Sequence, residues 1–331
     1  MTRIAVLGGG SWGTTLANML SEKGLDVGLW VREQELVDEI SKTGENSLFL
    51  PGVTLDSRLN VSQDQHEVMQ GADYFLVAIP TQFMRQTLEG AKHLFPQSPV
   101  VICASKGVEL ATLKPMSAVV HESLQEKEPR YAIISGPSFA GEVSRKLPTA
   151  VSLGCLDQDL GRRVRDILST DFFRVYANPD YKGVELGGAL KNIMAIAAGI
   201  SDGLEFGHDA RAALITRGLV EMARLGVALG GREKTFMGLS GMGDLVLTCT
   251  GDLSRNRQVG LKLGRGMTLD EILEGSRMVA EGVKTTESVR YLAGKKSVDM
   301  PITEQVYQVL FAHKDPRTAV QDLMTRELKM E

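Results

Sequence analysis

One lysine lies in the most apolar stretch of the chain. Lys191, with Asn192 beside it, interrupts residues 188–200, where almost every other neighbour is apolar or small. If this stretch is a buried helix, the lysine must reach a cleft or lose its hydration at a high cost. Partial burial would lower its pKa towards neutrality, where a lysine can donate and accept protons. The alternative is a lysine at a helix surface that extends its ammonium group to water.

A glycine-rich turn near the N-terminus has the spacing of a dinucleotide-binding site. Residues 8–13 fit G-x-G-x-x-G and lie between an apolar run and a helix-like stretch. In such a turn Gly8 makes the tight bend, Gly10 lets a pyrophosphate approach the backbone, and Gly13 lets the helix pack against the strand. The helix N-terminus offers free N–H groups and partial positive charge to the phosphates. An ordinary glycine-rich turn is the alternative.

The residue that ends the next expected strand indicates which dinucleotide binds. An acidic residue about 20 positions after the turn usually binds the ribose 2′-hydroxyl of NAD. This chain has Arg32 there, followed by Glu33. A guanidinium can bind the 2′-phosphate of NADP through two parallel hydrogen bonds. We therefore predict that NADP(H) is preferred, whereas Glu33 leaves room for NAD(H). A solvated arginine at a strand end is the alternative.

Further polar residues follow other expected strands. Ligands bind at the carboxyl ends of the strands in an open α/β sheet. Lys106, the Pro80-Thr81 turn and the loop at residues 136–142 each follow such a strand. We expect them to converge on one cleft, with Pro80-Thr81 lining a nicotinamide pocket. From its position alone, Lys106 could equally be a surface lysine.

Two polar segments lie in the largely apolar second half. The glycine-rich segment 239–244 ends in Asp244 and lacks the G-x-S-x-G spacing of a nucleophilic serine. Ser254 can cap a helix that begins with Arg255 and Asn256. A helix N-terminus with these side chains suits a phosphate. A capped surface helix is the alternative.

The pattern of elements predicts an α/β fold with a second, helical part. Strands that are apolar almost throughout alternate with helical stretches in the first half, which is typical of a Rossmann-type doubly wound sheet with parallel strands. We expect a dinucleotide-binding domain at residues 1–180 and an all-α substrate domain at 181–331. The expected strands are residues 3–7, 27–31, 74–79, 100–104, 132–135, 150–153 and 172–175. The expected helices are residues 14–23, 115–125, 188–200, 210–229, 255–265, 268–274, 285–292, 302–311 and 316–327.

Composition excludes several classes of function. The chain has 331 residues, 43% of them hydrophobic, and a net charge of -4, so it has no basic character for nucleic acid. No apolar run has the length of a membrane span, and no signal peptide precedes the first motif. The five histidines show no metal-ligand spacing, and we read the three cysteines as reduced. We therefore expect a cytoplasmic protein without a metal ion.

Taken together, the motifs resemble those of the bacterial NAD(P)-dependent glycerol-3-phosphate dehydrogenases. The resemblance covers nearly the whole chain, and the motifs occur in the same order as in that family. They are residues 8–13, Ser105-Lys106-Gly107, residues 135–140, Leu190-Lys191-Asn192, residues 241–244, Ser254-Arg255-Asn256 and residues 279–282.

The resemblance implies the reversible reduction of dihydroxyacetone phosphate to sn-glycerol 3-phosphate, for glycerophospholipid synthesis. It implies that Lys191 is the proton donor in reduction and that Lys106 helps to stabilise the developing oxyanion. The residues that would contact the cofactor are Ser11, Trp12, Arg32, Ala140, Val279 and Glu281. Those that would line the substrate and cofactor cleft are Lys106, Gly136, Ser138, Asp244, Ser254 and Asn256. Arg255 would meet the substrate phosphate and the cofactor.

Two other functions stay open at this point. A related two-domain dehydrogenase acting on a β-hydroxy acid such as 6-phosphogluconate would share a lysine on the central helix. A non-catalytic NADPH sensor would keep only the glycine turn, and Lys106, Lys191 and Asp244 disfavour it. We expect a homodimer, because dimers are the commonest assembly.

Overall fold

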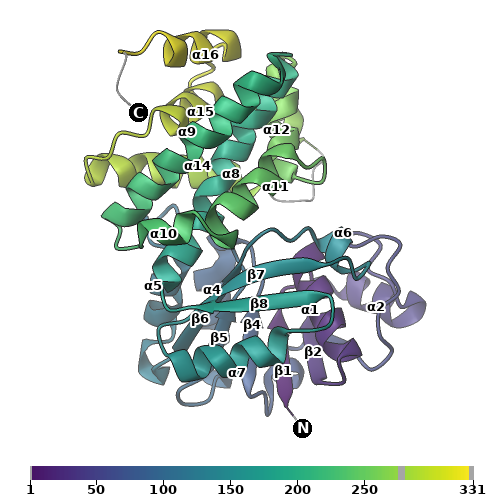
Figure 1. The fold of residues 1–331 in the computed structure, drawn as a ribbon. Coiled ribbons are helices and arrows are strands. Elements are labelled where there is room, and N and C mark those ends of the chain that lie inside the picture. Colours follow the sequence, from purple (N-terminus) through teal and green to yellow (C-terminus); the bar gives the residue numbers. More distant parts are fainter. Residues whose placement is uncertain (1, 275–279, 328–331) are drawn as a thin grey trace.

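The computed structural model describes residues 2–274 and 280–327 and contains one eight-stranded sheet with helices on both faces (Figure 1). The strand order is β3-β2-β1-β4-β5-β6-β7-β8. The strands are β1 (Arg3–Leu7), β2 (Asp26–Trp30), β3 (Asn60–Ser62), β4 (Tyr74–Val77), β5 (Val100–Cys103), β6 (Arg130–Ser135), β7 (Thr149–Gly154) and β8 (Phe173–Asn178).

The central strands β1, β4 and β5 are apolar and buried almost throughout because both faces of the sheet are covered there. Ile4 and Val6 of β1 belong to a core that includes residues of the helices α1 and α7. Ala5 and Leu7 point the other way, into a core shared with α3, α4 and α5. This confirms the doubly wound architecture. The helices of this half are α1 (Ser11–Glu22), α2 (Gln34–Thr43), α3 (Gln65–Met69), η1 (Thr81–Phe83), α4 (Met84–Gly90), η2 (Lys92–Leu94), α5 (Met116–Ser123), η3 (Gln125–Lys127), α6 (Ala140–Val143) and α7 (Gln158–Leu168).

The register brings the strand ends to one edge. Leu7 pairs with Trp30 of β2 and with Val77 of β4, so the ends of these three parallel strands coincide. β5 continues the alignment, because its last residue, Cys103, pairs with Val77. The segments that follow these strands therefore lie side by side, as ligand binding at a parallel sheet requires.

Two features of the sheet differ from the expectation. β7 runs antiparallel to β6, and β8 runs parallel to β7, so the sheet is not parallel throughout. A strand buried on both faces has the same apolar pattern in either direction, which is why the sequence did not reveal the reversal. β3 was not expected, because it has only three residues, Asn-Val-Ser, and lies at the edge of the sheet.

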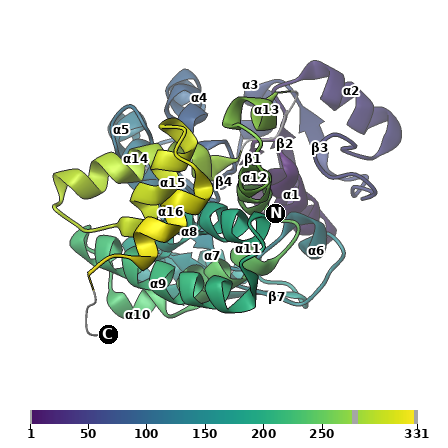
Figure 2. The same ribbon diagram turned by 90° about the horizontal axis from the view of Figure 1, so that it is seen from above.

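In its described residues, the second half consists of helices and the turns that join them, with no strand, and it lies to one side of the sheet (Figure 1; Figure 2 shows the view from above). β8 ends at Asn178 and α8 begins at Tyr181, and we retain residue 180 as the predicted domain boundary. The helices are α8 (Tyr181–Gly203), α9 (Gly207–Ala228), α10 (Glu233–Phe236), η4 (Leu239–Gly243), α11 (Asp244–Thr250), α12 (Arg255–Gly264), α13 (Leu269–Leu273), α14 (Glu281–Lys295), α15 (Pro301–Phe311) and α16 (Pro316–Met324).

The helix α8 is the centre of this half. Among the described helices it alone is long and apolar enough to cross a membrane, yet its apolar window is buried entirely inside the protein. It therefore forms the core of the helical half, against which α9, α11, α12 and α14 pack. α12 comes especially close, since a Cβ atom at Gly260 would lie 2.0 Å from the carbonyl oxygen of Ile196. This close packing fixes the N-terminus of α12 relative to Lys191.

Candidate active site

The glycine turn between β1 and α1 has the geometry that its spacing predicts. Gly8 has a φ of +122°, and a Cβ there would lie 2.5 Å from the carbonyl oxygen of Ala78. A Cβ at Gly13 would lie 1.9 Å from the carbonyl oxygen of Gly8, so the helix can pack here only without a side chain. A Cβ at Gly10 would meet no protein atom within 4 Å, which leaves its backbone open to a ligand.

Asn46, which the sequence analysis missed, supports this turn from behind. The side chain is fully buried, and its amide nitrogen donates to the carbonyl oxygen of Gly9 and to Thr14 Oγ1, each at 2.9 Å. The Ser11 hydroxyl donates to the carbonyl oxygen of Phe49 at 2.6 Å, so it is already occupied within the protein. Phosphates at this turn would therefore meet backbone N–H groups rather than the Ser11 side chain.

Trp12 belongs to the turn, and Arg32 follows the neighbouring strand β2. The Trp12 ring packs against Phe173 with a centroid distance of 6.3 Å, and its buried Nε1 has no hydrogen-bond partner in the described part of the chain. Arg32 follows β2, and 71% of its side chain is exposed. Its guanidinium pairs with Glu33 at 2.5 Å. The arginine is therefore available to an anion at this strand end, where Glu33 would compete for it.

Two lysines from different parts of the chain share one buried carboxylate. Lys191 Nζ donates to Asp244 Oδ1 at 2.5 Å and to Thr248 Oγ1 at 2.7 Å. Lys106 Nζ donates to Asp244 Oδ2 at 2.8 Å and to the carbonyl oxygen of Gly136 at 3.2 Å. Asp244 is 1% exposed and Lys191 is 7% exposed. The structure thus brings together Lys106, Lys191 and Asp244, which the sequence analysis had selected from three separate motifs.

This arrangement lowers the affinity of Lys191 for its proton. Burial, together with the positive charge of Lys106, lowers the pKa of Lys191 to about 8, although the charge of Asp244 acts in the opposite direction. For Asp244, burial would raise the pKa, but the two lysines outweigh it and keep the carboxyl pKa below its usual value. Lys191 can therefore exchange its proton near neutral pH while Asp244 stays ionised.

The helices α8 and α11 position Lys191, Asp244 and Thr248. Lys191 lies in the middle of α8, and Asp244 is the first residue of α11, directly after the single π-helical turn η4. Thr248 lies one turn further along α11, four residues from Asp244, which places both on one face of that helix. A Cβ at Gly188 would lie 2.3 Å from Ser135 Oγ and 3.3 Å from Lys106 Cδ. A glycine at this position therefore makes room for Lys106 beside α8.

The N-terminus of α12 is hydrogen-bonded to α8 next to Lys191. Ser254 caps the helix by accepting a hydrogen bond from the backbone N–H of Arg257 at 3.2 Å, as predicted. Asn256 donates to Asn192 Oδ1 at 3.0 Å and accepts from the backbone N–H of Gly282 at 2.9 Å. Asn256 therefore links α8, α12 and α14.

Arg255 points outward at the same place. Its side chain is exposed, yet surrounding protein atoms desolvate the guanidinium and lower its pKa, while the charge of Glu281 acts to raise it. Glu281 Oε1 accepts the backbone N–H of Thr81 at 2.9 Å, which joins α14 to the end of β4. Its buried Oε2 has no hydrogen-bond partner among residues 2–274 and 280–327. Val279 lies outside the described residues.

The loop after β6 contacts Lys106 from the side of the sheet. Gly136 has a φ of +146°, and a Cβ there would lie 2.9 Å from Val151 Cα. The Ser138 hydroxyl donates to the carbonyl oxygen of Gly136 at 3.0 Å, and Ala140 begins the short helix α6. The carbonyl oxygen of Gly136 therefore accepts from both Ser138 and Lys106.

The residues present fit a nicotinamide dinucleotide. The open backbone at Gly10, the N-terminus of α1 and the exposed Arg32 can hold its phosphates, and the unpartnered Glu281 Oε2 offers an acceptor near the end of β4. In the part of the chain that the structure describes, no three His, Cys, Asp or Glu side chains are grouped to hold a metal ion. The fold and the site define a two-domain nicotinamide-dependent dehydrogenase in which two lysines share one buried aspartate.

Comparison with known proteins identifies the family. Residues 3–161 match the model of the NAD-dependent glycerol-3-phosphate dehydrogenase N-terminus, and residues 180–321 match that of its C-terminus. The chain belongs to the family of NAD(P)-dependent glycerol-3-phosphate dehydrogenases and is an oxidoreductase. This confirms the resemblance inferred from the motifs.

Individual relatives agree over the full length. The chain is 64% identical to a glycerol-3-phosphate dehydrogenase [NAD(P)+] of Maridesulfovibrio salexigens, covering 99% of this chain and all of the relative. The crystal structure of a glycerol-3-phosphate dehydrogenase from Coxiella burnetii is 42% identical with a TM-score of 0.94, covering 98% of this chain and 99% of the other. The corresponding yeast structure, from Saccharomyces cerevisiae, is 26% identical with a TM-score of 0.83, covering 98% and 99%.

Proposed function

We propose that Lys191 is the proton donor in the reaction of this family, the reversible NAD(P)-dependent reduction of dihydroxyacetone phosphate to sn-glycerol 3-phosphate. The observation that carries this assignment is the pair of lysines on one buried aspartate. A reduced nicotinamide bound at the site would supply the hydride for the carbonyl carbon. Lys191 gives one proton to the carbonyl oxygen and becomes a neutral amine, which recovers a proton from solvent. In the oxidation direction the neutral amine accepts the hydroxyl proton.

Lys106 and Asp244 assist without exchanging that proton. Lys106 places a second positive charge at the same end of the cleft, where it stabilises negative charge that develops on the carbonyl oxygen. Asp244 holds both ammonium groups in place and balances their charge. Thr248 fixes the direction of Lys191 through the hydrogen bond to its ammonium group.

The N-terminus of α12 is the proposed phosphate site. Free N–H groups at a helix N-terminus and a guanidinium both attract a phosphate. We assign Arg255 to the substrate phosphate. The side-chain amide of Asn256 already bonds Asn192 and Gly282, so we assign Asn256 to the rigid lining of the site. Ser254 acts as the helix cap. Gly136 and Ser138 complete the cleft.

Cofactor binding is assigned to the turn and to the residues around it. The groups that support it are the turn glycines Gly8, Gly10 and Gly13 with the backbone of Ser11, and then Trp12, Arg32, Ala140, Val279 and Glu281. We propose a preference for NADP(H), because Arg32 rather than an acidic residue follows β2. We also retain the homodimer and the cytoplasmic location as predictions; sedimentation and cell fractionation would check them.

The proposed function is tested by steady-state reduction of dihydroxyacetone phosphate with NADPH and with NADH. We expect turnover with both cofactors and a lower KM for NADPH. A substrate panel that includes 6-phosphogluconate separates the β-hydroxy acid alternative. Cofactor binding without turnover of any substrate would instead indicate a sensor.

Arg32→Ala tests the basis of the cofactor preference. We expect the KM for NADPH to rise at least about 10-fold, because two charge-assisted hydrogen bonds to the 2′-phosphate are lost, whereas the KM for NADH changes little. Equal changes with both cofactors would show that Arg32 does not bind the 2′-phosphate. Arg58→Ala, at an exposed arginine paired with Asp56, is the control.

A further inference from the structure

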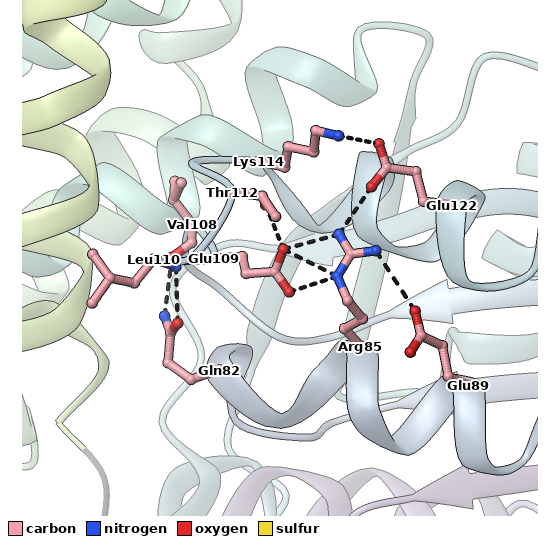
Figure 3. A network of polar contacts seen from close by, with 9 residues as sticks. All are labelled: Gln82, Arg85, Glu89, Val108, Glu109, Leu110, Thr112, Lys114 and Glu122. Atoms are coloured by element: carbon pink, nitrogen blue, oxygen red, sulfur yellow. Dashed lines mark hydrogen bonds and ion pairs between the residues drawn. The ribbon is translucent and has the colours of Figure 1, made fainter.

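The loop that carries Lys106 is held by a network of polar contacts on the side away from Asp244. This loop runs from the end of β5 at Cys103 to the start of α5 at Met116. Figure 3 shows Gln82 and Arg85, which follow β4, directed towards this loop. The contacts come from the neighbouring strand end and not from the helical half, so they are independent of the bonds that Lys106 makes to Asp244.

Gln82 bonds to the loop backbone at two places. Its side-chain nitrogen donates to the carbonyl oxygen of Val108 at 3.0 Å, and its side-chain oxygen accepts the backbone N–H of Leu110 at 2.9 Å (Figure 3). These two bonds satisfy a carbonyl and an N–H group in a segment outside the named strands and helices. The backbone two residues after Lys106 is therefore tied to the turn after β4.

Arg85 bonds to Glu109 through both carboxylate oxygens. Arg85 Nε lies 3.0 Å from Glu109 Oε1, and Nη2 lies 2.9 Å from Glu109 Oε2. Glu109 is 5% exposed and also accepts from Thr112. Burial acts to raise the pKa of Glu109, but the bonds from Arg85 and Thr112 lower it below its usual value. Arg85 also bonds Glu122 of α5 at 2.9 Å, so it joins the middle of the loop to the helix that follows it (Figure 3).

Two further contacts restrict the loop, one from the turn after β4 and one from the helical half. A Cβ at Gly107 would lie 2.5 Å from Thr81 Oγ1, and the Ser288 hydroxyl of α14 donates to the carbonyl oxygen of Val108 at 3.2 Å. The segment next to Lys106 is thus enclosed between the turn after β4 and the helical half. A change in the contacts of Gln82 or Arg85 would shift the backbone from which the Lys106 side chain extends.

We propose that Gln82 and Arg85, acting with Glu109, are positioning residues that place the Lys106 ammonium group between Asp244 and the carbonyl oxygen of Gly136. We call these three residues the loop clamp. The clamp touches none of the groups assigned to the substrate or the proton transfer. Its effect on the reaction therefore passes through Lys106, and the inference rests on the proposed function of that lysine. A misplacement of about 1 Å at a reacting group can cost about 100-fold in rate.

The test is a double-mutant cycle between Arg85→Met and Lys106→Ala in the full-length protein. We expect Arg85→Met alone to lower kcat/KM for dihydroxyacetone phosphate by about 10- to 100-fold, as misplacement of Lys106 requires. In the Lys106→Ala background the same change should cost less than about 3-fold, since coupled sites are not additive. The Kd for NADPH should stay within about 2-fold.

A pH profile separates positioning from general destabilisation. Lys106 contributes to the low pKa of Lys191, while Asp244 and Cys249 act on it in the opposite direction. If Lys106 moves away in Arg85→Met, the alkaline limb of kcat for reduction should shift to higher pH. A loss of stability alone would lower activity without moving that limb. Arg130→Met, which breaks an exposed ion pair to Asp157 in the same half of the protein, is the matched control and should change neither.

Gln82→Leu gives a second variant if Arg85→Met fails to fold, because it removes two neutral hydrogen bonds and leaves no buried charge unpaired. The same coupling to Lys106→Ala is expected. The clamp proposal is overturned if Arg85→Met and Gln82→Leu lower kcat/KM equally in the wild-type and the Lys106→Ala backgrounds. It is also overturned if neither variant changes kcat/KM although Lys106→Ala does. Unchanged kinetics in Lys106→Ala would instead overturn the proposed function of Lys106, and the clamp with it.

Discussion

At the scale of single residues, Lys191 is set apart by its surroundings rather than by its chemistry. An ordinary lysine keeps its proton well above neutral pH, whereas this one is buried beside a second ammonium group. A pKa near the working pH allows the same group to donate in one direction and accept in the other. Asp244 prevents the two positive charges from separating, since it bonds both lysines.

Lys191→Met should remove the proton donor and keep the length of the side chain. We expect kcat for reduction to fall at least about 100-fold, a typical contribution of general acid catalysis. In the wild-type protein, reduction requires protonated Lys191, so kcat should decline as the pH rises through about 8, whereas kcat for oxidation should rise over the same interval. pH-rate profiles in both directions check this. A profile for reduction that stays flat well beyond that pH would assign the proton to another group.

The site residues that sequence reasoning found are those whose type is unusual for their position. A lysine in an apolar helix and an aspartate after a glycine-rich turn stand out without a structure. Lys106 was a candidate because it follows an expected strand, and the resemblance gave it a role. Thr248, Asn46 and Gln82 were missed because a threonine in a helix or an amide in a loop is unremarkable. Only contacts between segments far apart in the sequence give them a role.

At the scale of elements, the start of α15 depends on a carboxylate from another helix. Glu221 of α9 accepts the backbone N–H groups of Ile302 at 2.6 Å and Thr303 at 3.3 Å. These N–H groups have no partner within α15 because they lie in its first turn. Glu221 is 3% exposed, and burial raises its pKa to about 7 despite these hydrogen bonds. The cap therefore joins α9 to α15 through a group that titrates in the physiological range.

Glu221→Gln should remove a dependence of stability on pH. The folded protein holds the Glu221 proton more tightly than the unfolded chain, so this residue stabilises the fold below about pH 4.5 and loses that contribution as the pH rises to about 7. Relative to Glu221→Gln, the wild-type free energy of unfolding should fall by up to about 3 kcal/mol across that interval. Urea denaturation at several pH values measures it. A difference between the two proteins that is independent of pH would contradict the raised pKa.

Element boundaries show where sequence patterns lose information. α1 begins at Ser11, within the glycine motif, rather than at residue 14, because the turn itself already adopts helical geometry. α14 extends from Glu281 to Lys295, beyond the expected residues 285–292, since packing against α8 stabilises turns whose residues are not apolar. The direction of β7 depends on the path of the connecting loop, and no periodicity records that path.

At the scale of the whole molecule, a buried polar group ties the helical half to the sheet. Glu185 of α8 accepts from Tyr131 Oη of β6 at 2.8 Å, and from the backbone N–H and the hydroxyl of Ser117 in α5, each at 2.7 Å. All three donors belong to the sheet half. Because a buried carboxylate is costly without such partners, the two halves are coupled in stability.

Tyr131→Phe should weaken this coupling. We expect the free energy of unfolding to fall by about 1–3 kcal/mol, because a buried carboxylate oxygen loses a donor. KM values should change little, because the site geometry does not involve Tyr131. Thermal and urea denaturation followed by circular dichroism measure the loss. Tyr176→Phe, at a tyrosine that is 47% exposed on β8, is the control, and an equal loss in both variants would refute the coupling.

The reversed strands β7 and β8 place the start of α8 against the sheet. β8 runs opposite to β6, and its last residue, Asn178, pairs with Gly154, which in turn pairs with Ile133 of β6. A Cβ at Gly154 would lie 2.7 Å from Tyr181 Cα, so α8 begins in contact with the end of β7. Lys191 lies ten residues after Tyr181, which corresponds to about 15 Å along the helix axis, close to the length of a strand. Lys191 is thus anchored by several helical turns on each side, and fraying of a helix end would not release it. We therefore expect any movement at the site during turnover to occur in the loops around it rather than in α8.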